Sequence, residues 1–348
     1  MTDYSRATVA QLAECDTVID VRSPAEYAED HIPGAINCPV LDNDERITVG
    51  TLYKQVSPFE ARKVGAALVA KNIARHLEGG LNQHQKSWKP LIYCWRGGQR
   101  SGAFTHILRE IGWAARRLDG GYKSWRHHVL EGLAALPPKL KFTVITGPTG
   151  SGKSRLLEAL AEQGAQVLHL EQIAAHKGSV LGGLPNEAQP SQKMFETRLH
   201  AALASFDTSR SVYVEAESRR IGVLSLPDAI HAAIHSSSCL CIEVSLQARV
   251  DFLLNDYAYF CNAEKLGKQL PRLKELQGSE RIARWQSLAE TGEYRTLVGE
   301  LLAQHYDPLY ARSQQRHLTQ LDGATVLAVD DLSPRSLNAL ATKILAAH

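Results

Sequence analysis

Short apolar runs alternate with segments of helical spacing along most of this chain. Runs of this kind, separated by helices, are typical of buried parallel strands. The apolar runs are residues 17–21, 91–93, 114–118, 141–146, 166–170, 211–214, 240–244 and 325–329. The segments of helical spacing are residues 100–111, 122–133, 154–163, 246–255 and 337–345. The alternation predicts an α/β fold built on parallel sheets.

A break in this pattern predicts two domains. The sequence Leu136-Pro137-Pro138-Lys139 ends a helical segment, and a chain of 348 residues is long enough for two cores. We expect a first domain at residues 1–136 and a second at 137–348, the latter with a helical segment at about 246–315. The first domain carries a helical insert at about residues 40–88. Within it, residues 42–46 are predicted to form a polar turn and residues 60–77 a helix, either as surface structure or as a substrate contact.

Composition and charge narrow the class of protein. The net charge is only +2, with 44% hydrophobic and 22% charged residues, so a nucleic-acid site must be a local patch. No apolar run reaches membrane-spanning length, and the N-terminus has no signal-peptide core. We therefore expect a cytoplasmic protein without membrane or DNA partners. The six cysteines show no CxxC pair and no zinc spacing, so five are interpreted as packing residues and no metal cluster is expected.

The remaining cysteine, Cys94, follows the apolar run 91–93 and precedes a glycine-containing loop. Backbone N–H groups of such a loop point inward, and the following helix adds partial positive charge. Together with two arginines, this environment favours a reactive thiolate and an oxyanion-binding cradle over a buried structural cysteine. The supporting residues are Arg96, Gly97, Gly98, Gln99, Arg100 and Ser101.

A second loop carries the most specific signal in the chain. Residues 147–154 read G-P-T-G-S-G-K-S, directly after a predicted strand and before a predicted helix. This is the P-loop pattern, whose backbone N–H groups bind a di- or triphosphate. Its lysine neutralises phosphate charge and its serine can hold Mg²⁺. The predicted phosphate-binding residues are Gly147, Thr149, Gly150, Ser151, Gly152, Lys153 and Ser154.

Other polar residues follow neighbouring strands of the second domain. Glu215 and Glu217 follow a predicted strand; we expect only one of them to face the P-loop, as a metal contact or a base, and the sequence leaves open which. His176 and Lys177 follow another strand, where such sheets bind ligands, although His176 could equally be a surface residue. Arg219 and Arg220 complete the predicted second-domain site.

A mixed aromatic and basic segment extends from residue 257 to residue 285. Such a segment could contact RNA through phosphate binding and base stacking, although a solvated helical face is the more common explanation. Its aromatic and basic members are Tyr257, Tyr259, Phe260, Lys265, Lys268, Arg272, Lys274, Arg281, Arg284 and Trp285.

Five motifs in the first domain resemble a rhodanese domain over about residues 10–135. They are Asp20-Val21-Arg22, Glu26-Tyr27, His31-Ile32-Pro33-Gly34-Ala35, the Cys94 loop and Gly120-Gly121-Tyr122-Lys123-Ser124-Trp125. The resemblance implies that Cys94 carries a chalcogen atom, that residues 96–101 form its cradle with Arg100 as a charged rim, and that Asp20 and Arg22 are scaffold. The fold class is then a rhodanese-like parallel α/β domain, followed by a P-loop NTPase-like α/β domain with a helical C-terminal part.

The fusion of these two domains resembles the tRNA 2-selenouridine synthase family over essentially the whole chain. Four further stretches carry the match, namely residues 49–55, 175–179, 215–222 and 306–310. The resemblance implies an enzyme that geranylates wobble 2-thiouridine (U34) of tRNA with geranyl diphosphate. It then replaces the S-geranyl group with selenium from selenophosphate, held by Cys94 as a selenosulfide. S-alkylation makes ring carbon C2 electrophilic, and the P-loop lysine would stabilise the departing diphosphate.

The resemblance also sets the expected partners. These are tRNA and a selenophosphate donor or its synthase; no tightly bound cofactor is expected, and Mg²⁺ is an option through Ser154. The sequence locates no apolar groove for the ten-carbon chain. Two alternatives stay open: an ATP-dependent tRNA sulfurtransferase, although its usual adenylating loop is not found, and a non-enzymatic P-loop regulatory or partner-binding module.

Overall fold

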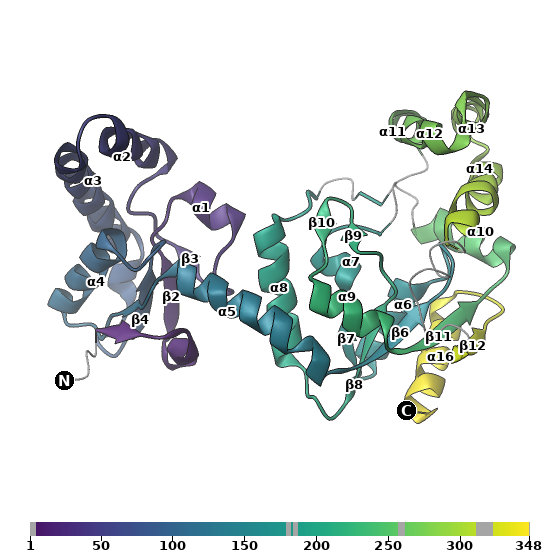
Figure 1. The fold of residues 1–348 in the computed structure, drawn as a ribbon, viewed down its shortest axis with the longest axis horizontal. Helices are drawn as coiled ribbons and strands as arrows, with labels where there is room; N and C mark the ends of the chain where they lie inside the picture. Colours follow the sequence, from purple (N-terminus) through teal and green to yellow (C-terminus); the bar gives the residue numbers. More distant parts are fainter. Residues whose placement is uncertain (1–4, 179–181, 184–186, 257–261, 311–322, 348) are drawn as a thin grey trace. The chain divides into compact units, whose positions relative to one another are not determined.

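A computed structural model describes residues 5–178, 182–183, 187–256, 262–310 and 323–347 (Figure 1). The chain divides into two compact units. Unit 1 comprises residues 1–132 and 190–201, and unit 2 comprises residues 133–189 and 202–348. Unit 1 therefore includes a segment, residues 190–201, that lies beyond the boundary expected at residues 136–137.

Unit 1 is built on the parallel sheet that the sequence predicts. Its five strands have the order β1-β5-β4-β2-β3, and all neighbouring pairs are parallel. The strand before Cys94, β4, is thus the central strand and is buried along its whole length. The strands are β1 (Arg6–Ala7), β2 (Thr17–Asp20), β3 (Ile36–Asn37), β4 (Pro90–Tyr93) and β5 (Arg116–Leu118).

Helices of unit 1 pack against this sheet. Phe104 and Leu108 of α4 and Ile73 of α3 share one buried core with Ile19 and Ile92 of the strands. The helices are α1 (Pro24–Glu29), α2 (Asn43–Gln55), α3 (Pro58–Gly79), α4 (Gln99–Ile111), α5 (Tyr122–Ala135) and α8 (Gln192–Ser205), of which α5 and α8 continue into unit 2 at their ends.

The predicted turn at residues 42–46 is wrong, because these residues begin helix α2. Asp42 caps the helix: its carboxylate accepts a hydrogen bond from the Glu45 N–H at 2.8 Å, and Glu45 returns one to the Asp42 N–H. This reciprocal capping box turns a polar stretch into a helix start. The same device at Ser23 and Glu26 begins α1.

Unit 2 is built on a second parallel five-stranded sheet, in the order β12-β11-β6-β8-β7. The strand before the P-loop, β6, is again the central one. The run 166–170 ends earlier than predicted, because Leu170 opens a short helix. The strands are β6 (Lys141–Thr146), β7 (Gln166–Leu168), β8 (Ser211–Glu215), β11 (Ser238–Glu243) and β12 (Thr325–Ala328), with a separate antiparallel pair β9 (Arg220–Ile221) and β10 (Leu224–Ser225).

Two groups of helices complete unit 2. Helices α6 and α16 share a buried core with the sheet, and a second cluster joins α11, α13 and α14. The helices are α6 (Lys153–Glu162), α7 (Leu170–Ile173), α9 (Asp228–His235), α10 (Leu246–Asp256), α11 (Ala263–Gln269), α12 (Lys274–Gln277), α13 (Ser279–Glu290), α14 (Tyr294–Leu301) with a π-helical continuation at Leu302–Tyr306, and α16 (Pro334–Ala347).

The second cluster changes the interpretation of the aromatic and basic segment. Trp285 is fully buried and its indole N–H donates to Glu300, so it is a core residue and does not face RNA. Arg284 pairs with Glu300 and Lys268 with Glu264. Tyr257, Tyr259 and Phe260 lie outside the described residues. What the structure describes of this segment is a solvated helical face over a core.

The described part of the chain contains no helix long and apolar enough to cross a membrane.

Candidate active sites of the two units

The Cys94 loop joins β4 to α4 and folds around the cysteine sulfur. The Gly98 N–H donates to Cys94 Sγ at 3.3 Å, and Ser101 Oγ lies 3.2 Å from the same sulfur. Cys94 is only 4% exposed, whereas Trp95 and Arg96 are exposed beside it. The structure thus brings the predicted cysteine together with two members of its predicted cradle.

The Gly120–Gly121 turn lets a second helix support this loop. A Cβ atom on Gly121, whose φ is +62°, would lie 2.3 Å from the Cys94 carbonyl oxygen, so only glycine fits. The Tyr122 N–H donates to the Cys94 carbonyl at 2.8 Å, and the Lys123 N–H donates to the Trp95 carbonyl at 3.0 Å. The first turn of α5 therefore holds the carbonyls of Cys94 and Trp95, while the Gly98 N–H contacts the sulfur.

Arg100 does not carry an uncompensated charge at the loop. Its guanidinium donates to Glu26 at 2.7 and 3.3 Å. Burial opposes the charged form of Glu26, but the hydrogen bonds and charge of Arg100 outweigh it and hold the pKa of Glu26 below its usual value. The predicted charged rim at Arg100 is in effect an ion pair, and Arg96 remains the exposed cation of the loop.

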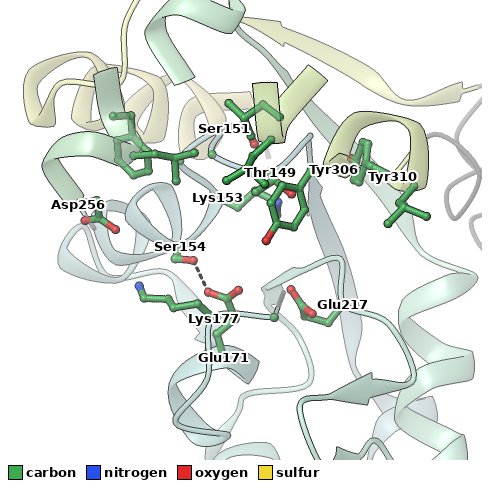
Figure 2. Close-up of a pocket in the computed structure, with 18 of the residues that line it drawn as sticks. Thr149, Ser151, Lys153, Ser154, Glu171, Lys177, Glu217, Asp256, Tyr306 and Tyr310 are labelled. Atoms are coloured by element: carbon green, nitrogen blue, oxygen red, sulfur yellow. Dashed lines mark hydrogen bonds between the residues drawn. The ribbon is translucent and has the colours of Figure 1, made fainter. Parts of the chain in front are cut away.

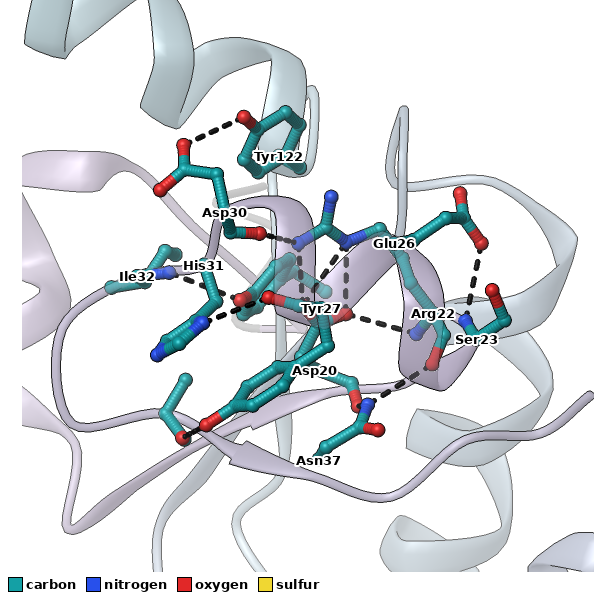
Figure 3. A network of polar contacts seen from close by, with 12 residues as sticks. Asp20, Arg22, Ser23, Glu26, Tyr27, Asp30, His31, Ile32, Asn37 and Tyr122 are labelled. Atoms are coloured by element: carbon teal, nitrogen blue, oxygen red, sulfur yellow. Dashed lines mark hydrogen bonds and ion pairs between the residues drawn. The ribbon is translucent and has the colours of Figure 1, made fainter. Parts of the chain in front are cut away.

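A buried polar network around Arg22 underlies the same region (Figure 3). Arg22 and Asp20 are 1% and 0% exposed and form a bidentate ion pair with a closest distance of 2.6 Å. Arg22 also donates to the Asp30 carbonyl at 2.6 Å and lies under the Tyr122 ring, whose hydroxyl donates to the Asp30 carboxylate. Asp20 and Arg22 are thus structural, as the rhodanese resemblance implies.

The P-loop joins β6 to α6 and has the geometry of an anion cradle. Gly150 and Gly152 have φ values of +80° and +77°, which turn the backbone N–H groups into the loop. Lys153 Nζ donates to the Gly147 carbonyl at 2.9 Å, and the Ser154 hydroxyl donates to Glu171 at 2.8 Å. Lysine and serine therefore lie where a bound diphosphate would meet them.

Three carboxylates gather beneath this loop. Glu215 pairs in register with Ile145 of β6, and its carboxylate accepts the Glu171 N–H at 2.8 Å. Glu217 lines the open space together with Glu171, as Figure 2 shows. The question that the sequence left open is thereby resolved, because Glu217 faces the P-loop side and Glu215 lies buried behind it.

Gly178 explains how two of these carboxylates approach each other. A Cβ atom at this position would lie 2.7 Å from Glu217 Oε1 and 2.8 Å from Glu171 Oε1. Burial, followed by the charges of Glu171 and Glu215, raises the pKa of Glu217 to about 8. Burial and the Glu171 charge raise the pKa of Glu215 to about 7. Perturbed carboxyls of this kind are typical of functional sites.

A cavity of about 960 Å³ opens from the P-loop, and we call it the P-loop cavity. One end is polar, formed by the loop, Glu171, Lys177 and Glu217. Another part of the lining is apolar and comes from the helical segment expected at about residues 246–315, in which the sequence located no groove. Its apolar members are Phe252, Leu253 and Leu254 of α10, Leu266 of α11, Leu297, Val298 and Leu301 of α14, and Leu302 and Leu309 beyond it.

Residues after α14 close on the P-loop from the side. The Tyr310 hydroxyl lies 2.7 Å from Thr146 Oγ1 and accepts the Gly147 N–H at 2.6 Å. Arg249 is 5% exposed, donates to the Thr149 carbonyl at 3.0 Å and forms a bidentate pair with Asp307. The helical part therefore holds the first half of the phosphate-binding loop, at Gly147 and Thr149.

The remaining predicted residues separate into two groups. Lys177, Arg219 and Arg220 line the P-loop cavity, and Arg219 also pairs with Asp228. His176 does not line it; its ring is buried, and a Cβ atom on Gly222 would lie 2.9 Å from it. Among the described residues, no group of three or more His, Cys, Asp and Glu side chains could hold a metal ion.

Comparisons with known proteins agree with the predicted order of two domains. A family model described as the tRNA 2-selenouridine synthase AAA domain matches residues 140–270, and a rhodanese-like domain model matches residues 5–128. A protein of Nitrosomonas europaea named tRNA 2-selenouridine synthase is 34% identical, over 78% of this chain and 71% of its own length. A protein of the same name from Shewanella pealeana is 32% identical, over 94% and 90%. This chain belongs to the tRNA 2-selenouridine synthase family.

These members of the tRNA 2-selenouridine synthase family are named as enzymes, and this chain is therefore an enzyme as well. A further relative, from Bdellovibrio bacteriovorus, is 31% identical over 87% of this chain and 90% of its own length. The predicted fold class, a rhodanese domain followed by a P-loop domain, is confirmed by the two family models.

Three functional candidates were missed in the sequence, namely Arg249, Asp307 and Tyr310. A signal was present, because residues 306–310 carry part of the family resemblance without a role attached. The apolar cavity wall was also missed. Leu297 and Leu301 recur at helical spacing and could have indicated a buried helix face, but not which cavity it lines.

Proposed function

We propose that this chain is a cytoplasmic enzyme that converts wobble 2-thiouridine of tRNA into 2-selenouridine in two steps. In the first, geranyl diphosphate alkylates the sulfur. In the second, selenium from selenophosphate replaces the S-geranyl group. One observation carries the first step: the P-loop cavity combines a diphosphate-binding loop with a continuous apolar wall.

The two ends of the P-loop cavity match the two ends of geranyl diphosphate. The loop N–H groups and Lys153 bind the diphosphate and stabilise the charge that develops on it as the allylic C–O bond breaks. Leu297, Val298 and Leu301 offer an apolar surface to the ten-carbon chain. A nucleoside triphosphate would use the loop but would leave much of this wall without a matching partner.

Magnesium fits this site through Ser154. Mg²⁺ prefers oxygen ligands and keeps several waters, and it is commonly bound by one or two protein oxygens together with substrate phosphates. Ser154 would supply one oxygen and the diphosphate others, and the ion would neutralise part of the diphosphate charge. No tightly bound cofactor is proposed.

The second step belongs to Cys94. A carrier for one chalcogen atom needs a nucleophilic sulfur within a small anion cradle, and the Gly98 N–H, Ser101 and exposed Arg96 provide one. Loading starts from Cys94 as a mixed disulfide with a small thiol: the selenium of selenophosphate attacks Cys94 Sγ, the small thiol leaves, and water cleaves the P–Se bond to release phosphate. The selenosulfide then attacks ring carbon C2 of the S-geranylated base and displaces geranyl thiol. A thiol reductant finally cleaves the Cys94 S–Se bond, which leaves selenium on the base and returns the cysteine thiol. The proposed partners are tRNA and a selenophosphate donor or its synthase.

The test is stepwise reconstitution with the purified full-length chain. With 2-thiouridine tRNA and geranyl diphosphate alone, mass spectrometry of the nucleosides should show S-geranyl-2-thiouridine. Addition of selenophosphate should convert it into 2-selenouridine. If base modification instead requires ATP and releases pyrophosphate from it, the chain is an ATP-dependent sulfurtransferase. If neither set of substrates changes the tRNA, the regulatory-module alternative holds.

A further inference from the structure

Glu217 occupies a distinctive position in the P-loop cavity. It follows β8 by two residues and lines the cavity together with Lys153 and Glu171. In Figure 2 its carboxylate projects into the space beneath the P-loop, on the side that also holds Glu171. Gly178 leaves room for that carboxylate, because a Cβ atom there would lie 2.7 Å from Glu217 Oε1. Glu217 is therefore held within the space where the proposed substrates meet.

The proposed alkylation releases a proton that needs an acceptor. The thione sulfur attacks C1 of geranyl diphosphate, an S–C bond forms, and the C–O bond breaks with its electron pair going to the diphosphate. As the C2–S bond becomes single, C2 and N3 form a double bond and the N3 proton must leave. The products are the neutral S-geranyl base, diphosphate and one proton.

We propose that Glu217 is the catalytic base that accepts the N3 proton of 2-thiouridine during S-geranylation. This inference rests on the geranylation proposed above and assigns a role that the P-loop itself cannot fill. The loop supplies N–H donors and Lys153 a cation, whereas removal of a proton requires an acceptor in the same cavity.

The surroundings of Glu217 suit this role. Burial, followed by the negative charges of Glu171 from α7 and Glu215 from β8, raises the pKa of Glu217 to about 8, and the charge of Lys153 opposes this rise. Lys177, Arg219 and Arg220 also line the cavity. A carboxylate with a pKa near the working pH is a stronger base than an ordinary glutamate yet is still partly ionised. Glu171 is less suited, because its carboxylate accepts the Ser154 hydroxyl at 2.8 Å.

The experiment compares wild type, Glu217→Gln and Glu217→Asp in single-turnover geranylation of 2-thiouridine tRNA. Glu162→Gln, at an exposed position at the end of α6, is the matched control. We expect Glu217→Gln to lower the rate about 10²-fold, the lower range for general base catalysis, with little change in the KM for geranyl diphosphate. Glu217→Asp should retain intermediate activity, and the control should match wild type.

The pH profile separates a base from a structural residue. The wild-type rate should rise with pH as Glu217 ionises and then level off, whereas Glu217→Gln should lose that rise. Equal rates for wild type and Glu217→Gln would overturn the inference. So would a defect that extra Mg²⁺ restores or that appears only in KM, since Glu217 would then bind metal or diphosphate. If wild type itself does not geranylate, the proposed function fails and not the assignment of the base.

Discussion

The two loops of this protein begin from the same architecture and end in different chemistry. Each follows the central strand of a five-stranded parallel sheet, β4 in unit 1 and β6 in unit 2, and each precedes a helix. Each contains glycines with positive φ, at Gly97 in the first loop and at Gly150 and Gly152 in the second. Both therefore present backbone N–H groups to an anion.

The difference lies in what surrounds each loop. Cys94 is enclosed by Gly98, Ser101 and the first turn of α5, so its cradle suits a small group carried on one sulfur. The P-loop instead opens into a cavity of about 960 Å³ with an apolar wall and the half-buried carboxylates of Glu171 and Glu217. In the proposed function, this shared strand–loop–helix geometry serves a single-atom carrier in one unit and binds a diphosphate with a long apolar tail in the other.

The largest expected effect is the loss of selenation, with geranylation retained, when the proposed carrier cysteine is replaced. Cys94→Ala removes the only atom proposed to hold selenium, so 2-selenouridine formation should fall to background. Geranylation should be retained at least in part, because the P-loop cavity is unchanged. Nucleoside mass spectrometry after each step measures both. Cys15→Ala, a half-buried cysteine of unit 1, is the control. Normal selenation by Cys94→Ala would show that the two loops do not divide the work as proposed.

Replacement of the P-loop lysine is expected to have the opposite result, with geranylation lost and selenation retained. Lys153→Ala should lower the geranylation rate about 10²–10³-fold, the usual cost of removing one electrostatic contact to a developing anion. The same variant should still convert supplied S-geranyl tRNA into 2-selenouridine. Lys139→Ala, an exposed lysine before β6, controls for loss of positive charge. Loss of both steps in Lys153→Ala would instead indicate one shared site.

Much of the fold could be predicted from the sequence, because apolar runs bounded by glycine and proline determine buried parallel strands directly. Both central strands and both loops follow from such runs. Residues 42–46 were predicted incorrectly as a turn, since the same polar residues that favour turns also cap helices, and only the reciprocal bonds of Asp42 and Glu45 distinguish the two. Contacts between distant segments leave no such local signal.

The candidate sites also divide into local motifs, which the sequence reveals, and contacts between distant segments, which it does not. Cys94, Lys153 and Ser154 sit in local motifs and were found. The position of Trp285 in a core, the Arg100–Glu26 ion pair and the contact of Tyr310 with Gly147 depend on how helices pack, which periodicity does not specify. The sequence could not show which of Glu215 and Glu217 faces the P-loop, because residues two apart share one face of a strand and only the path of the chain beyond the end of β8 at Glu215 separates them.

A smaller effect tests whether the apolar wall of the P-loop cavity binds the ten-carbon geranyl chain. Val298→Trp places a larger side chain at a half-buried position of the P-loop cavity. The KM for geranyl diphosphate should rise about tenfold, equivalent to about 1.4 kcal/mol of lost binding. The five-carbon dimethylallyl diphosphate should be affected less, since it reaches less of the wall. Leu276→Trp, at a position that is 62% exposed, is the control. An equal rise in KM for both donors would mean that the geranyl chain binds somewhere other than this wall.

The smallest expected effect concerns the ion pair between Arg100, beside the Cys94 loop, and Glu26. Because the pKa of Glu26 is lowered by Arg100, this pair contributes stability above the ordinary glutamate pKa of about 4.3 and loses it as the pH falls through the lowered value. Glu26→Gln should therefore cost about 1 kcal/mol at pH 7 and less in acid. Denaturant unfolding followed by tryptophan fluorescence reports mainly on unit 1, since Trp88, Trp95, Trp113 and Trp125 lie there and only Trp285 lies in unit 2. Glu78→Gln, at an exposed position of α3, should leave the free energy of unfolding unchanged both at pH 7 and in acid. A pH-independent loss in Glu26→Gln would mean that Arg100 is held by packing, leaving its charge available to the anion at Cys94.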